Sequence, residues 1–220
     1  MTNSVENLKI TKVLKIERIS SDSRIIFLER NFTFKAGQVI GITTRRQIPP
    51  RLYSIASGEN DAEIQILYKT VPSGTLTPHL DLLKTGDSVW VSEPFGSFLG
   101  STDPAWLICS GTGIAPYLAM IKSGQINEKI LLHGSRFYEN FYFADYLRYT
   151  LGTNYKQCCT GEILEGVFSG RVTDYIEKNL TPQPKYKYYL CGSAEMVVES
   201  RQILIEKGIR FSDILSEIYF

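Results

Sequence analysis

The sequence lacks the paired cysteines from which thiolate metal centres are built. Its four cysteines are Cys109, Cys158, Cys159 and Cys191, and none of them belongs to a Cys-x-x-Cys pair. Structural zinc sites and iron–sulfur clusters usually take their ligands from such pairs. We therefore predict no metal site, and any redox chemistry would need another kind of cofactor.

Long apolar runs and an excess of charge of one sign are also missing. No apolar stretch approaches the roughly 20 residues of a membrane helix, and the N-terminal sequence MTNSVENLKI has no basic segment followed by an apolar one. The 24 Lys and Arg residues nearly balance 23 Asp and Glu residues, without a basic run that would follow a phosphate backbone. We expect a cytoplasmic protein with no membrane or nucleic-acid partner.

The chain contains two halves that differ in the periodicity of their hydrophobic residues. Short alternating or β-branched runs lie between Leu8 and about Val91, separated by Gly, Pro, Asn and Asp, which predicts an antiparallel barrel or sandwich. The later half alternates buried strands with helices, which predicts a parallel sheet. The expected strands are residues 105–110, 129–135, 154–160 and 187–193, and the expected helices are residues 114–124, 139–151, 171–180 and 194–208.

A boundary is predicted near Ser101 to Pro104, where Gly, Ser, Asp and Pro cluster. We therefore predict one domain over residues 1–101 and a second over residues 102–220.

The segment RLYSIAS, residues 51–57, sets a fixed cation, an aromatic ring and two hydroxyls side by side. The double proline before it favours an extended entry into this segment. An ordinary edge strand can have this composition, and so can a strand that binds a ligand.

Two strand-to-helix turns carry glycines. CSGTGIAPYLAMI places Gly111 and Gly113 after a strand and Pro116 at the opening of a helix, where backbone N–H groups favour an anion. Tight packing explains these glycines equally well, because Pro116 replaces the third glycine of the GxGxxG pattern. YLCGSAEM repeats the arrangement with Cys191 and Gly192 at the ligand-binding edge of the sheet. Cys191 by itself also fits a buried core cysteine.

Arg136 follows a predicted strand, and Arg171 lies at the start of a predicted helix. Both can offer two parallel N–H donors to a phosphate, although surface arginines are common.

These pieces together resemble the ferredoxin–NADP reductase family, and more closely its bacterial type, over nearly the whole chain. RLYS resembles the family's flavin motif, LYKTVPSGTLTPHL its pyrophosphate segment, GTGIAPY its nicotinamide-nucleotide turn, CGSAEM its CG motif and SEIYF the end that covers the flavin. The resemblance implies an N-terminal antiparallel Greek-key β-barrel that binds FAD. It also implies a C-terminal Rossmann-like α/β domain with a parallel sheet that binds NADP(H).

The resemblance also assigns roles. Arg51 would pair with the FAD pyrophosphate, Tyr53 would lie on the isoalloxazine and Ser54 would hydrogen-bond near flavin N5. Tyr219 would cover the flavin as a gate, with Phe220 on the adenine. The expected catalytic residues are Ser54, Cys191, Glu217 and Tyr219. The expected FAD-binding residues are Arg51, Leu52, Tyr53, Ser54, Leu67, Tyr68, Lys69, Gly74, Thr75, Leu76, Thr77, Thr112, Tyr219 and Phe220. The expected NADP-binding residues are Gly111, Thr112, Gly113, Pro116, Arg136, Arg171, Cys191, Gly192 and Met196.

The implied activity is hydride transfer between NADP(H) and FAD, with single electrons passing to or from ferredoxin or flavodoxin, by a monomer. The stretch after the third predicted parallel strand has Thr160-Gly161 where the family has a serine-arginine pair, so preference for NADP would rest on Arg136 and Arg171. EPFGSF, residues 93–98, also resembles the wider flavin reductase superfamily. The alternatives are a reductase that serves an oxygenase or free flavin, and a nonenzymatic flavoprotein subunit.

Overall fold

The computed structural model describes residues 8–219, and for Tyr219 the backbone only. The chain divides by its contacts into two units, each containing a sheet of six strands. One unit comprises Met1–Gly100 with Ala115–Ser123, and the other comprises Ser101–Ile114 with Gly124–Phe220. No helix within the described part of the chain is long and apolar enough to cross a membrane.

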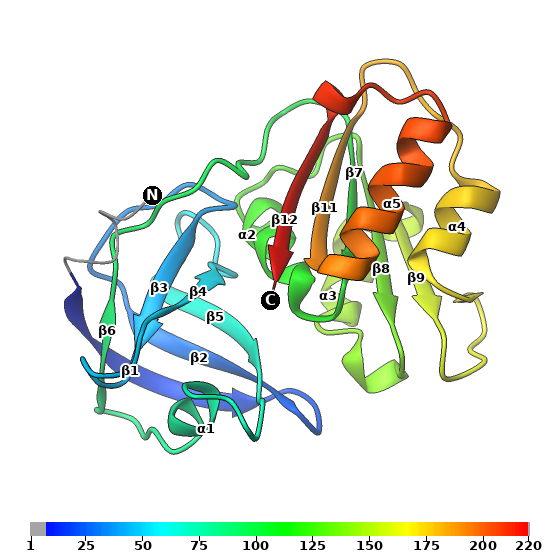
Figure 1. Cartoon of the computed structure of the whole chain (residues 1–220). Helices are drawn as coiled ribbons and strands as arrows, with labels where there is room; N and C mark the ends of the chain where they lie inside the picture. Colours follow the sequence, from blue (N-terminus) through cyan, green and yellow to red (C-terminus); the bar gives the residue numbers. More distant parts are fainter. Residues whose placement is uncertain (1–7, 220) are drawn as a thin grey trace. The chain divides into compact units, whose positions relative to one another are not determined.

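The first unit is an antiparallel β-barrel (Figure 1). The sheet order β4-β3-β6-β1-β2-β5 is closed by a bridge between Ile55 and Ile66, which joins the segment after β4 to β5. Isoleucine, leucine and valine side chains at alternate strand positions, with Tyr68, fill the inside of the barrel. The elements are β1 (Lys9–Arg18), β2 (Ser23–Glu29), β3 (Val39–Thr43), β4 (Arg51–Ser54), β5 (Glu63–Lys69), α1 (Thr77–Leu80) and β6 (Ser88–Val91).

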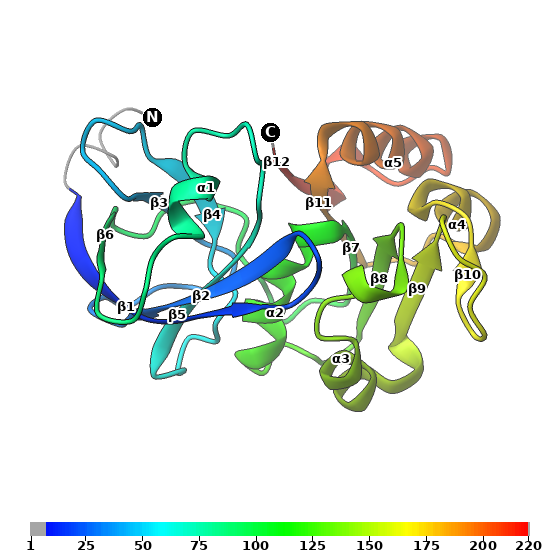
Figure 2. The same ribbon diagram turned by 90° about the horizontal axis from the view of Figure 1, so that it is seen from below.

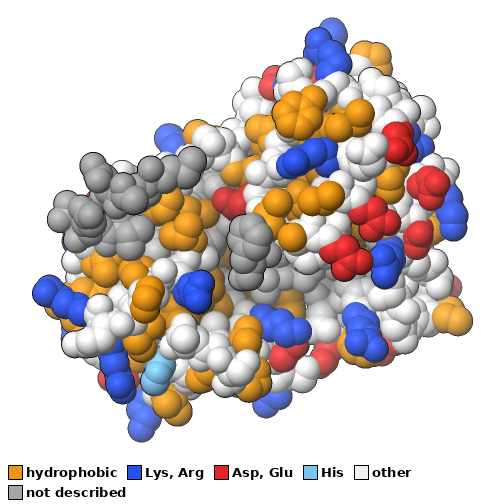
Figure 3. Space-filling model, in the orientation of Figure 1, with side chains coloured by type: hydrophobic (Ala, Val, Ile, Leu, Met, Phe, Trp, Pro, Cys, Tyr) orange, Lys and Arg blue, Asp and Glu red, His pale blue; other side chains and the backbone are white. Residues whose placement is uncertain are grey.

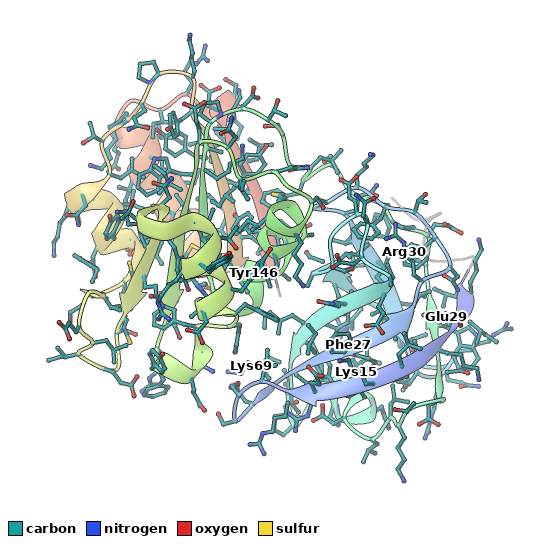
Figure 4. All side chains as sticks on the ribbon, turned by 180° about the vertical axis from the view of Figure 1, so that it is seen from behind. Lys15, Phe27, Glu29, Arg30, Lys69 and Tyr146 are labelled. Carbon is teal, nitrogen blue, oxygen red and sulfur yellow. The ribbon has the colours of Figure 1, made fainter. Side chains whose placement is uncertain are left out.

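Charged side chains on the outside of the barrel are fixed by local contacts (Figure 4). Lys15 on β1 places its Nζ atom 4.1 Å from the centre of the Phe27 ring on β2. The Arg30 guanidinium donates to the carbonyls of Glu59 and Asp61, at 2.6 Å and 2.7 Å. The two Arg30 hydrogen bonds hold the loop that leads into β5.

The second unit is a parallel sheet in the order β10-β9-β8-β7-β11-β12. Helices α4 and α5 cover one of its faces and α3 the other (Figure 2). Strands such as Ala105–Ser110 read as continuous apolar runs because both of their faces are buried. The elements are β7 (Ala105–Ser110), β8 (Lys129–Ser135), α3 (Ala144–Leu151), β9 (Tyr155–Cys159), β10 (Phe168–Ser169), α4 (Val172–Asn179), β11 (Lys187–Ser193), α5 (Ala194–Glu206) and β12 (Ile214–Tyr219).

Helix α2 (Ala115–Lys122) has its contacts with the barrel unit, although it follows a turn of the parallel sheet in sequence. The Lys122 ammonium donates to the Gln65 side chain at 2.6 Å. The Ser123 hydroxyl accepts the backbone N–H of Glu59 at 2.9 Å. The amino-acid composition does not indicate that α2 belongs with the barrel unit. The domain boundary predicted at residues 101–102 remains a prediction.

The predicted fold class is confirmed, with three local differences. Strands β10 and β12 are not among the predicted elements, because β10 has only two residues and residues 216–220 are predicted to form a covering tail. The predicted helix 139–151 is shorter, since Phe143 has a left-handed backbone with φ of 60° and α3 begins only after it. Phe220 lies outside the described residues.

Candidate flavin and nicotinamide sites

The two predicted glycine turns lie against each other at the carboxyl edge of the parallel sheet. A Cβ atom on Gly113 would fall on the Cys191 carbonyl and 2.9 Å from the Gly192 Cα atom. Gly192 itself has φ of 149°, and a Cβ atom there would lie 2.6 Å from the Ser110 hydroxyl. Only glycine lets the turn after β7 approach the end of β11 so closely.

Cys191 lies between two register partners, Cys109 on β7 and Glu217 on β12. Adjacent strands are about 4.8 Å apart, so the structure brings two of the predicted catalytic residues, Cys191 and Glu217, together. The Cys191 side chain is fully buried. Burial raises the pKa of the neighbouring Cys109 thiol well above its usual value, so that thiol stays protonated.

The RLYS segment forms β4, which pairs with β3 through Ser54 and Val39. Arg51 and Leu52 are exposed, the latter to 53%, while Tyr53 is half-buried against the barrel core and Ser54 is buried. Burial raises the pKa of Tyr53 to about 12, although the positive charge of Arg51 acts to lower it. The tyrosine is therefore a neutral ring beside an exposed guanidinium.

The segment after β5 is anchored by Asp81. Its carboxylate accepts hydrogen bonds from the Tyr68 hydroxyl at 3.0 Å and the Thr70 hydroxyl at 2.8 Å, and pairs with Arg24 at 3.2 Å. Burial and this hydrogen bond raise the pKa of Tyr68. These contacts fix the start of the predicted pyrophosphate segment.

The loop that follows is a tight turn leading into α1. The Gly74 N–H donates to the Val71 carbonyl at 2.8 Å, and the Thr77 hydroxyl accepts the Val71 N–H at 2.9 Å. Thr75 is exposed and Leu76 is buried. This geometry is compatible with an ordinary turn and also with the pyrophosphate cradle that the resemblance implies.

The remaining predicted site residues take varied positions. Leu67, Pro116 and Met196 are buried, Gly111 and Thr112 are half-buried, and Lys69 is exposed and paired with Asp22 at 2.6 Å. Tyr219 ends β12 opposite Ser193. Arg136 and Arg171 are exposed at the carboxyl edge of the sheet, after β8 and before α4.

The predicted cofactors fit the residues that would hold them. No carboxylate within residues 8–219 lies at ion-pair distance from Arg51 or Arg136. An exposed guanidinium that lacks a carboxylate partner is suited to a phosphate. In the same described range, no cluster of His, Cys, Asp and Glu is arranged to hold a metal ion.

Comparison with known proteins gives the class first. Residues 10–99 match the oxidoreductase FAD-binding domain family, and residues 107–202 match the oxidoreductase NAD-binding domain family. The chain is therefore a two-domain oxidoreductase with a flavin-binding and a dinucleotide-binding domain.

Relatives of the whole chain give the family. The reductase component of the naphthalene 1,2-dioxygenase system of Pseudomonas putida, a ferredoxin–NAD(P)(+) reductase, is 30% identical, with 94% of this chain and 68% of that protein covered. The ferredoxin–NADP reductase of Pseudomonas aeruginosa is 27% identical, with 97% and 95% covered. A ferredoxin NADP+ reductase from Neisseria gonorrhoeae, solved with FAD and NADP, shares the fold with a TM-score of 0.89 at 20% identity, with 97% and 99% covered. The chain belongs to the ferredoxin–NADP reductase family.

Proposed function

We propose that this chain transfers a hydride between NADP(H) and FAD and exchanges single electrons with ferredoxin or flavodoxin. The observation that carries the proposal is the arrangement at β11, where Gly113 and Gly192 bring two turns into contact beside Cys191 and Glu217. A bound flavin bridges two-electron chemistry at the nicotinamide and one-electron chemistry at a protein carrier.

The barrel residues would bind and orient the flavin. Arg51 supplies a charged fork for the pyrophosphate, and the turn from Gly74 to Thr77 supplies backbone donors. Tyr53 offers a neutral aromatic face, and Ser54 a buried hydroxyl at the end of β4.

The residues of the parallel sheet would position the nicotinamide. Gly111 and Gly113 allow the dinucleotide to approach the backbone, while Cys191 and Glu217 stand at the reacting end. Tyr219, next but one to Glu217 on β12, would cover the flavin until the nicotinamide displaces it.

The electron carrier would be acidic and would meet basic side chains of the barrel. Four candidates are Lys35, Arg45, Arg46 and Lys69. Lys35 is already paired with Glu59 at 3.1 Å, as Lys69 is with Asp22. We therefore favour Arg45 and Arg46, two exposed side chains between β3 and β4.

A second function is supported by the relative from the naphthalene 1,2-dioxygenase system. The chain would then feed electrons to the ferredoxin of an oxygenase, through the same flavin and nicotinamide sites. The two functions differ only in the acceptor.

The test is anaerobic stopped flow on the purified flavoprotein, following flavin bleaching by NADPH and by NADH over a range of concentrations. We expect saturable bleaching, and reduction of added ferredoxin or flavodoxin in steady state. If neither NADPH nor NADH bleaches the flavin, the proposal is refuted and a nonenzymatic flavoprotein is favoured. Acceptor specificity then separates the two functions.

A further inference from the structure

The two arginines predicted to bind the 2′-phosphate of NADP have different electrostatic surroundings. The Arg136 guanidinium lies 5.1 Å from the centre of the Phe137 ring and, among residues 8–219, has no carboxylate partner. Arg171 places its Nη1 atom 3.4 Å from the Glu195 carboxylate and 3.9 Å from the Glu199 carboxylate. Only one of the two arginines is therefore available to a phosphate without competition.

The packing of two helices produces this difference. Arg171 immediately precedes α4, and Glu195 and Glu199 lie one turn apart on the first half of α5, which packs beside α4. Residues four apart share one helix face, so both carboxylates point toward the same guanidinium. Acidic side chains gather over α4 and α5 (Figure 3).

The loop after β9 adds no cation and contributes another carboxylate. A Cβ atom on Gly161 would lie 2.5 Å from the Arg136 carbonyl and 2.9 Å from the Phe137 ring, so a larger residue does not fit without backbone movement. The exposed Glu162 carboxylate accepts the Tyr138 N–H at 2.5 Å. The missing arginine of the family pattern is thus excluded by packing.

We propose that Glu195 and Glu199 are specificity-determining residues that engage Arg171 and weaken its attraction for a 2′-phosphate. The inference rests on the proposed function, and its consequence is that NADH is used about as well as NADPH. A 2′-phosphate would have to displace two carboxylates or lie beside them. An unphosphorylated ribose meets no such repulsion, and its hydroxyls can donate to a carboxylate.

The test compares kcat/KM for NADPH and NADH in the wild-type flavoprotein and in a Glu195→Gln/Glu199→Gln variant. Glutamine keeps size and hydrogen bonding while removing charge. Glu206→Gln, on the same helix but bonded to Gln202 rather than to Arg171, is the matched control. We expect a wild-type NADPH/NADH ratio within about tenfold of one, and a rise of about tenfold in the double variant. This rise should shrink at high salt.

Adding Arg171→Ala to the double variant should remove the gain, because Arg171 is the group that is released. A wild-type preference for NADPH above a hundredfold, or an equal ratio in the double variant and wild type, would overturn the inference while leaving the proposed function intact. Failure of both nucleotides to bleach the flavin would instead refute the proposed function.

Discussion

The buried histidine of the parallel sheet predicts how stability depends on pH. His133 on β8 is fully buried, its Nδ1 atom lies 3.0 Å from the Tyr155 hydroxyl, and the Phe141 ring meets it edge-on. Its Nε2 atom has no hydrogen-bond partner among the described residues. Burial lowers the pKa of His133 from 6.5 to about 3, so the folded protein keeps the ring neutral.

The direction of this pH dependence follows from proton uptake by the unfolded chain. When the pH falls below 6.5, the unfolded chain protonates His133, whereas the folded chain does so only near pH 3. The unfolded state therefore binds more protons between these values, and the free energy of unfolding decreases as the pH falls through this window. With these two pKa values, a change from pH 7 to pH 5 removes about 2 kcal/mol.

The assay is urea unfolding of the flavoprotein at pH 7 and pH 5, followed by tryptophan fluorescence. Trp106 lies on β7 beside β8, and a Trp90→Phe background makes it the only tryptophan. We expect His133→Gln to lose about 2 kcal/mol less than the parent between the two pH values. The other histidine, His79, is only half-buried, and His79→Gln is the matched control for replacing a histidine.

Equal losses in His133→Gln and the parent would refute the reasoning, because the pH dependence would then arise from other groups. The absolute stability of the variant does not matter, since only the difference between the two pH values is compared.

Two further predictions concern the ligand sites. Gly113→Ala should destabilise the protein by about 1–3 kcal/mol through overpacking and should raise KM for the nicotinamide. Gly111 has open space around its Cβ position, so Gly111→Ala should cost only the strain of a left-handed residue, about 1 kcal/mol. Thermal unfolding and steady-state kinetics measure both variants, and a smaller effect at position 113 than at position 111 would contradict the packing argument. Arg51→Gln should weaken FAD binding by roughly 10- to 100-fold, as expected for the loss of a charge-assisted phosphate contact, while Arg45→Gln should leave FAD binding unchanged. Flavin release is measured by ultrafiltration. Equal retention of FAD by the two variants would contradict the role of Arg51.

Much of the fold follows from the sequence because its physical causes are local. Strands such as Ala105–Ser110 are buried on both faces and therefore apolar throughout, while helices show their own period. The strand Ile214–Tyr219 was missed because it belongs to the sheet through pairing with β11, which begins 27 residues earlier at Lys187.

The candidate site also has one part that the sequence predicts and one part that it does not. The glycine turns were predictable, because a close backbone approach requires glycine at Gly113 and Gly192. The surroundings of the arginines were not, because 24 residues separate Arg171 from Glu195 and only the packing of α4 on α5 brings them together. A sequence motif identifies an arginine as a possible phosphate ligand, but its affinity for the phosphate depends on which carboxylates the fold places beside it. By this criterion Arg51 and Arg136, which have no carboxylate at ion-pair distance within residues 8–219, are open to a phosphate, whereas Arg171 is already paired with Glu195 and Glu199 of α5.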